Sequence, residues 1–109
     1  MAKTYQIIFT DFAEERLEEI TNYLLENASY EVANKVLNGI LDSIDKLARL
    51  PNANPKELAI CSEQTIYRRI LKWSYKIIYT VDEDQVRVIV VDIRHTSEDP
   101  QKIVDRFSS

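Results

Sequence analysis

The chain has 109 residues, of which 45% are hydrophobic and 29% are charged, a balance typical of one globular domain rather than a disordered chain. One cysteine excludes an internal disulfide, and one glycine excludes the glycine-rich loops that bind phosphates. The formal net charge of −4 gives the protein as a whole no attraction to nucleic acid. We therefore expect a single domain over residues 1–109.

The composition also bears on location and cofactors. The N-terminal residues lack the apolar core of a secretion signal, and no apolar run approaches the roughly 20 residues that span a bilayer. A single histidine and a single cysteine cannot build the common multi-ligand metal sites. We expect a cytoplasmic protein without a membrane span, a metal or a cofactor.

The first 50 residues predict one strand and two helices. Residues 3–9 alternate apolar and polar side chains, as a strand does. Thr10 or Asp11 can cap a first helix, and Ser29 can cap a second helix that runs to about Leu50. The apolar stripes of the two helices are formed by Ala13, Leu17, Ile20 and Leu24, and by Ala33, Leu37, Ile40, Ile44 and Leu47.

The link between these helices is only a few residues long, so they are expected to form an antiparallel hairpin. Gly39 lies in the middle of the second helix, where glycine costs roughly 1 kcal/mol relative to alanine. We expect it there because a neighbouring helix or strand comes close. Pro51 ends the helix, and residues 51–65 form a polar connection whose length is typical of functional loops.

Three antiparallel strands are predicted next, over residues 67–73, 75–81 and 86–95, because β-branched and aromatic residues recur with a period of two. The alternation places Trp73 on one face with Tyr67 and Leu71, which predicts a tryptophan in the core. The same rule sets His95 on one face after Ile89, Val91 and Ile93.

A short terminal helix is expected to begin near Pro100. The fold class is therefore α+β: an N-terminal strand, an antiparallel helical hairpin on one sheet face, a three-stranded antiparallel meander and a C-terminal helix. The other sheet face is expected to be partly open. Arg68, Lys72 and Lys76 are expected to project there or into a groove at its edge.

Two features of the meander point to chemistry or binding. His95, the only histidine, is either a hydrogen-bonded residue at a strand end or a general acid or base near neutral pH. Cations interleave with aromatic side chains, which suits nucleic acid or an acidic partner but also an ordinary core beneath a solvated face. These cations are Arg68, Arg69, Lys72, Lys76 and Arg94.

The whole chain resembles the RelE/ParE superfamily of bacterial type II toxins, also called plasmid-stabilisation proteins. The resemblance lies in the strand YQIIFT, in the apolar spacing from Ala13 to Leu24, and in the helix end from Ile44 to Pro51. It continues through YRRI, YKIIY and IRH in the three later strands. It implies a small toxin neutralised by a cognate antitoxin whose tail wraps it, in a toxin–antitoxin hetero-oligomer.

Within that superfamily, RelE- and YoeB-like members cut mRNA on the ribosome, and ParE-like members poison DNA gyrase without catalysis. By resemblance to the first branch, Glu57 matches the base, Arg69 a phosphate-binding arginine and His95 the acid. Lys76 stands where an arginine is usual, and a lysine lacks the bidentate fork. Further RNA or phosphate contacts are expected from Arg68, Lys72, Lys76 and Arg94.

The first functional prediction is therefore a ribosome-dependent mRNA endoribonuclease that arrests growth by blocking translation. The alternatives are a gyrase poison that works by protein contact and an inactive module retained for antitoxin binding. The acidic balance of the chain favours a protein target, because a ribosome presents a dense array of phosphates.

Overall fold

The computed structural model describes residues 3–107 and contains three α-helices and four strands. The observed order is β1 (Gln6–Phe9), α1 (Asp11–Asn27), α2 (Tyr30–Asp45), β2 (Tyr67–Lys72), β3 (Tyr75–Asp82), β4 (Arg87–His95) and α3 (Pro100–Phe107). This confirms the predicted α+β class and the order of its elements. Two short 3₁₀ turns, Lys46–Ala48 and Pro51–Ala53, follow α2.

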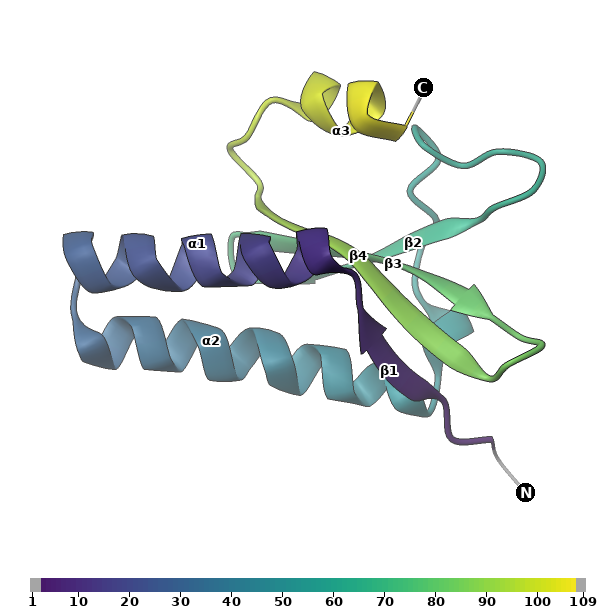
Figure 1. The fold of residues 1–109 in the computed structure, drawn as a ribbon, viewed down its shortest axis with the longest axis horizontal. Helices are drawn as coiled ribbons and strands as arrows, with labels where there is room; N and C mark the ends of the chain where they lie inside the picture. Colours follow the sequence, from purple (N-terminus) through teal and green to yellow (C-terminus); the bar gives the residue numbers. More distant parts are fainter. Residues whose placement is uncertain (1–2, 108–109) are drawn as a thin grey trace.

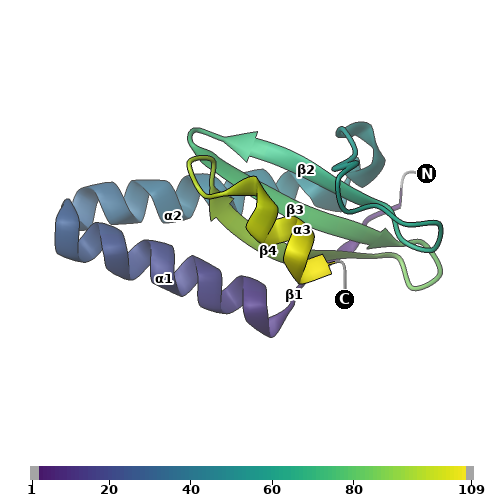
Figure 2. The ribbon, with the colours of Figure 1, turned by 90° about the horizontal axis from the view of Figure 1, so that it is seen from above.

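The four strands form one sheet in the order β1-β4-β3-β2. The strands β2, β3 and β4 form the predicted antiparallel meander, whereas β1 runs parallel to β4 at the edge. Figure 1 shows α1 and α2 side by side and α3 on the other side of the sheet. Seen from above, the helical hairpin extends past the sheet at the α1–α2 link (Figure 2).

Both helical caps are those expected from the sequence. Thr10 Oγ1 accepts the N–H of Ala13 at 3.1 Å, and Ser29 Oγ accepts the N–H of Val32 at 3.1 Å. The second helix ends at Asp45, earlier than the predicted Leu50. The chain tightens there into a 3₁₀ turn, and the carbonyl of Ala48 accepts the N–H of Tyr5 at 2.7 Å, which joins the helix end to β1.

Each face of the sheet has its own apolar core. The larger core lies between the sheet and the helical hairpin and includes Ala13, Ile40, Ile44, Leu47, Ile77, Tyr79, Val88, Val90 and Ile93. The smaller core lies beneath α3 and consists of Ile60, Ile78, Val91 and Ile103, with Tyr67 and Phe107 packed against it. The second face is therefore covered by α3 at one end and open at the other, where Leu71 is 61% exposed.

A β-bulge changes the predicted facing of β4. Ile78 pairs with Asp92 and Tyr79 pairs with Val90, so Val91 is an extra residue on β4. Because the alternation shifts at this point, Val91 packs beneath α3 whereas Ile93 packs against the helical hairpin. The predicted single face for Ile89, Val91, Ile93 and His95 was therefore wrong.

Trp73 is not a core residue, and this prediction was also wrong. It lies in the two-residue turn between β2 and β3, has a φ of 52° and is 52% exposed. Alternation does not extend into a turn, so the face shared with Tyr67 and Leu71 does not continue to it. The ring lies instead over Gly39 of α2 and fills the space that a Cβ atom would occupy. The close approach expected at Gly39 is thus confirmed.

Candidate functional site

The connection after α2 brings Glu57 against the edge of the sheet. The N–H of Glu57 donates to the carbonyl of Tyr67 at 2.7 Å, and the N–H of Arg69 donates to the carbonyl of Pro55 at 3.0 Å. The Glu57 side chain, 14% exposed, then lies 3.0 Å from Lys76 Nζ and 4.0 Å from Arg69 Nη1. Three residues predicted from the sequence are thus brought together, and we call them the Glu57 cluster.

The Glu57 carboxylate is already ion-paired within this cluster. Arg69 Nη1 also donates to the carbonyl of Lys56 at 2.6 Å, so the guanidinium is fixed by the connection itself. The carboxylate and the two cations therefore pair with one another within the folded chain.

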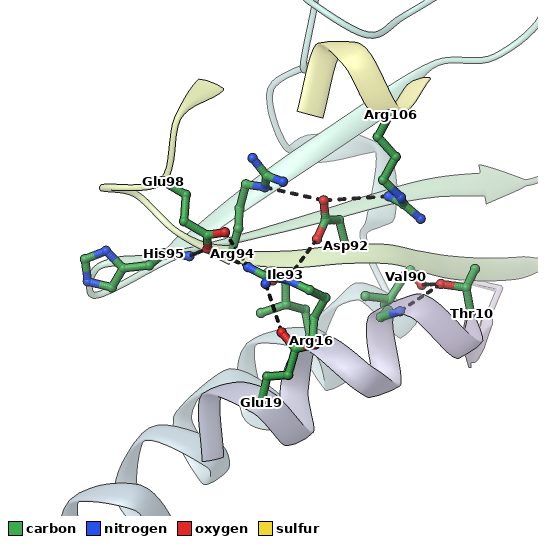
Figure 3. Close-up of polar contacts among 11 residues, drawn as sticks. Thr10, Arg16, Glu19, Val90, Asp92, Ile93, Arg94, His95, Glu98 and Arg106 are labelled. Atoms are coloured by element: carbon green, nitrogen blue, oxygen red, sulfur yellow. Dashed lines mark hydrogen bonds and ion pairs between the residues drawn. The ribbon is translucent and has the colours of Figure 1, made fainter. Parts of the chain in front are cut away.

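A second ionic cluster lies on the same sheet face beneath α3. The carboxylate of Asp92 is fully buried, and three guanidinium groups approach it: Arg94 Nε at 3.4 Å, Arg106 Nη1 at 3.6 Å and Arg16 Nε at 3.8 Å (Figure 3). These four residues, the Asp92 cluster, join β4 to α1 and α3. Arg94 was predicted to contact phosphate, and the structure places its buried side chain against Asp92.

Arg106 shows how tightly this cluster is packed. Its guanidinium lies 3.6 Å from the ring centroid of Phe12 and 4.6 Å from that of Phe107. Burial lowers the pKa of the Arg106 guanidinium below its ordinary value, and the Asp92 carboxylate acts in the opposite direction. The cluster was not found from the sequence, although an acidic residue inside an apolar strand is an available signal.

Arg16 also fixes the segment that follows β4. Its Nη2 donates to Glu98 Oε1 at 2.6 Å, and its Nε donates to the carbonyl of Ile93 at 3.0 Å. Glu98 Oε2 in turn accepts the backbone N–H of His95 at 2.7 Å. The chain beyond β4 is therefore held against α1 on both sides of His95.

Arg68 and Lys72 lie apart from the Glu57 cluster. Their pairing partners on β3 are Tyr79 and Tyr75, which pack against the helical-hairpin core, whereas Lys76 leaves β3 on the other face. Arg68 Nη1 donates to the carbonyl of Asn54 at 2.7 Å, and Lys72 Nζ lies 4.6 Å from the Trp73 ring centroid. Lys76 thus lies on the predicted open face, and Arg68 lines a hollow at the edge formed by β2. The expectation that these cations project from the open face or into a groove at its edge was wrong for Lys72, which lies on the helical-hairpin side.

His95 lies on the helical-hairpin side of the sheet. Its ring makes an edge-to-face contact with Tyr75, with centroids 5.4 Å apart. Its Nδ1 accepts the backbone N–H of Ser97 at 3.0 Å and lies 2.7 Å from Ser97 Oγ. Figure 3 shows the ring pointing away from the Asp92 cluster. His95 and Glu57 therefore contact opposite faces of β3, through Tyr75 and Lys76.

Two further findings concern residues 3–107 only. No helix in this range has the length and apolar character required to cross a membrane. No three or more of its histidine, cysteine, aspartate and glutamate side chains gather closely enough to hold a metal ion.

Comparison with known families matches residues 7–100 to the ParE toxin of the type II toxin-antitoxin system, parDE. The chain belongs to the ParE toxin family. It is thus a toxin of the RelE/ParE superfamily, as the sequence patterns predicted. No significant match is found among curated protein sequences.

Solved structures share the fold of this ParE-family chain. A chain of the chromosomal ParDE system from P. aeruginosa superposes with a TM-score of 0.67 at 14% identity, covering 84% of this chain and 96% of that one. The RelE–RelB complex of Pyrococcus horikoshii OT3 gives a TM-score of 0.61 at 13% identity, with coverages of 89% and 100%. RelBE2 of Mycobacterium tuberculosis gives 0.58 at 17% identity, with coverages of 85% and 92%.

Proposed function

We propose that this toxin arrests growth by binding DNA gyrase, in the manner of ParE-like members of the superfamily, and that it does not cleave mRNA. Its cognate antitoxin would neutralise it by covering the toxin surface. The match to the ParE family supports this proposal. The observation that carries it is the separation of Glu57 and His95 on opposite sides of the sheet.

Cleavage by attack of a 2′-hydroxyl needs a base on the attacking oxygen and an acid on the leaving oxygen of one phosphate. Each group must come within hydrogen-bond reach, about 2.6–3.2 Å, of its own oxygen. Glu57 lies against Lys76, and His95 lies against Tyr75, two consecutive residues whose side chains leave β3 on opposite faces. One phosphate bound at the Glu57 cluster is therefore out of line with His95.

The hydrogen bonds of His95 tie its ring to the segment after β4. Nδ1 accepts the N–H of Ser97 at 3.0 Å, so the N–H of a neutral ring lies on Nε2. These contacts and the edge-to-face contact with Tyr75 hold the ring on the helical-hairpin side, away from a phosphate bound at the Glu57 cluster.

Charge supports a protein target as well. The chain carries 18 acidic and 14 basic residues, and two of the predicted phosphate contacts, Arg94 and Lys76, are held by Asp92 and Glu57. Binding to a polyanion depends on cations that are free to replace counterions. These residues are engaged within the protein instead.

Two measurements test the proposal together. Purified toxin is added to DNA gyrase and relaxed plasmid, and supercoiling is followed without ribosomes or mRNA. In parallel, mRNA 5′ ends are mapped by primer extension minutes after the toxin alone is induced in a bacterium. We expect inhibited supercoiling and unchanged mRNA ends. Full supercoiling at excess toxin, with new cuts inside translated frames, would overturn the proposal.

The Glu57 cluster favours mRNA cleavage as the second candidate, since it assembles the predicted base with Arg69 and Lys76. That function predicts cuts in mRNA that Glu57→Gln abolishes. Glu63→Gln is the matched control, because Glu63 is an exposed glutamate of the same connection. Cuts that persist in Glu57→Gln would rule out Glu57 as the base, and a wild-type toxin that makes no cuts would remove this candidate.

A further inference from the structure

Two hollows adjoin at the end of the sheet nearest the α1–α2 link. One, of about 470 Å³, lies between α1 and the segment after β4, and the other, of about 340 Å³, lies between α2 and the β2–β3 turn. Tyr75 and His95 line both, so the hollows form one groove with these two rings at its centre. We call it the Tyr75–His95 groove.

The rim of this groove carries two aromatic side chains that are more than half exposed. Tyr23 of α1 is 65% exposed at one end, and Trp73 is exposed at the other. Apolar residues of the helices, Ile20 and Val36, form the walls between them. Exposed aromatic residues around a central hollow are the usual anchors of protein–protein interfaces.

Trp73 is held in place before any partner arrives. Its positive φ is a strained conformation for a residue with a side chain, and its ring fits over Gly39. Lys72 Nζ lies 4.6 Å and Lys35 Nζ 5.8 Å from the ring centroid, within the range of cation–π attraction. A fixed anchor loses little side-chain entropy on binding, which strengthens an interface.

The charges of the groove differ between its two ends. Lys35 and Lys72 make the Trp73 end cationic. At the Tyr23 end, Glu19 and Glu98 share a single guanidinium, that of Arg16. A nucleic acid strand would be repelled by the second end, whereas a peptide can place its carboxylates at the first end alone.

His95 supplies a directional contact at the centre. Its proton belongs on Nε2, as the Ser97 hydrogen bond requires, and within residues 3–107 that nitrogen has no hydrogen-bond partner. The ring therefore offers one N–H donor to a backbone carbonyl or a carboxylate in the groove.

We propose that the Tyr75–His95 groove is the surface by which the toxin docks on its protein target. The segment it fits has an apolar side chain that enters between Tyr23 and Trp73. A carboxylate of the segment reaches Lys35 and Lys72, and a carbonyl accepts the His95 N–H. This inference rests on the proposed function, since it assigns that function to one surface.

The test uses intact DNA gyrase as the probe and measures the toxin concentration that halves supercoiling. We expect Lys35→Glu/Lys72→Glu and Trp73→Ala each to raise that concentration at least about tenfold. Lys102→Glu, an exposed charge reversal on α3, is the matched control and should leave it unchanged. Circular dichroism and thermal unfolding check that every variant folds.

A pair of variants at His95 tests the donor role. Glutamine keeps an N–H near the position of Nε2, and alanine removes it, so His95→Ala should weaken inhibition more than His95→Gln does. Equal losses for both variants would overturn the role of His95 as a donor. Equal losses are also the result expected if His95 were an acid catalyst, because neither alanine nor glutamine can transfer a proton.

The remaining outcomes distinguish an error in the proposed docking surface from an error in the proposed target. If the wild type inhibits gyrase and the lysine and Trp73 variants do so equally well, the groove is not the docking surface, although the proposed function survives. If those variants keep inhibition but escape neutralisation by the cognate antitoxin, the groove belongs to the antitoxin instead. A wild-type toxin without effect on gyrase would overturn both proposals.

Discussion

The indole ring of Trp73 fills the space above Gly39 that any larger residue at that position would need. Gly39→Ala should therefore displace the ring. The cost in stability is small, because the half-exposed ring loses only its contacts with Gly39 and the nearby lysines, and alanine favours the helix by about 1 kcal/mol. We expect a free energy of unfolding within about 1 kcal/mol of the wild-type value.

Because Trp73 is the only tryptophan, its fluorescence reports this displacement directly. Gly39→Ala should shift the emission to longer wavelength and raise quenching by acrylamide. Asn38→Ala makes the same kind of change at the neighbouring exposed position and should alter neither. Identical spectra for Gly39→Ala and the wild type would show that the Trp73 ring does not pack over Gly39.

Asp92 is the residue whose loss should damage the fold most. Asp92→Asn removes the negative charge that Arg16, Arg94 and Arg106 share, although Arg16 keeps its ion pair with Glu98. Breaking a buried ion pair in this way costs about 3–5 kcal/mol. Urea unfolding measures the loss, and hydrogen exchange should show that the amides of α3 lose protection first.

The matched control for this change is Asp84→Asn in the β3–β4 turn. Asp84 is exposed, so its substitution should alter the free energy of unfolding by no more than about 0.5 kcal/mol. A similarly small change for Asp92→Asn would mean that Asp92 does not hold α3 to the sheet.

Glu83, in the β3–β4 turn, should give the protein an acid-dependent contact with the segment before β1 and with the 3₁₀ turn Pro51–Ala53. Its Oε1 accepts from Asn52 Nδ2 and its Oε2 from Tyr5 OH, each at 2.8 Å. These hydrogen bonds, that of Asn52 first, lower the pKa of Glu83 below its ordinary value. A lowered pKa in the folded state stabilises it above the ordinary pKa, and this contribution is lost as pH falls through the lowered value.

Thermal unfolding between pH 7 and pH 3 checks this expectation. Glu83→Gln should lower the melting temperature at pH 7 and make it less dependent on pH in the acid range. Glu63→Gln, at an exposed glutamate, should follow the wild-type curve. The expectation fails if Glu83→Gln has the same acid dependence as the wild type.

Local signals in the sequence were enough to predict most of the fold. The caps at Thr10 and Ser29 depend only on residues one helical turn away. The apolar stripes of both helices and the glycine at position 39 reflect contacts with the element packed directly against each helix. Arg69 and Lys76 were singled out from the pattern of the meander, but Glu57 was predicted only by resemblance, because Glu57 and Lys76 are far apart in the chain.

The errors in the predicted fold occur where one residue changes the sheet face on which the following side chains lie. The extra residue Val91 reverses the facing of Ile93 and His95, and the turn at Trp73 removes it from the strand pattern. A period of two shows no sign of either event. Val90 and Val91 are equally apolar, and Leu71, Trp73 and Tyr75 continue the alternation through the turn. The placement of His95 away from Glu57, which bears most on function, follows from the bulge.

The bulge itself can be tested by removing one residue. Val90 and Val91 are consecutive valines, so deleting either gives the same sequence, in which Val88, the remaining valine and Ile93 alternate regularly with Ile89 and Asp92. Every other side chain keeps its face. The expected cost is the burial of one valine, about 1.5–3 kcal/mol, and the chain should still unfold cooperatively in urea.

Deletion of Ile93 is the matched control, because it also removes one residue but reverses the sheet face of the residues that follow. Asp92 would keep its place, Arg94 would turn into the core beneath the helical hairpin, and His95 would turn away from Tyr75. An unpaired guanidinium there cannot be accommodated, so this variant should not fold. If the single-valine chain also fails to fold while Val91→Ala folds, the bulge is required for the sheet rather than tolerated by it.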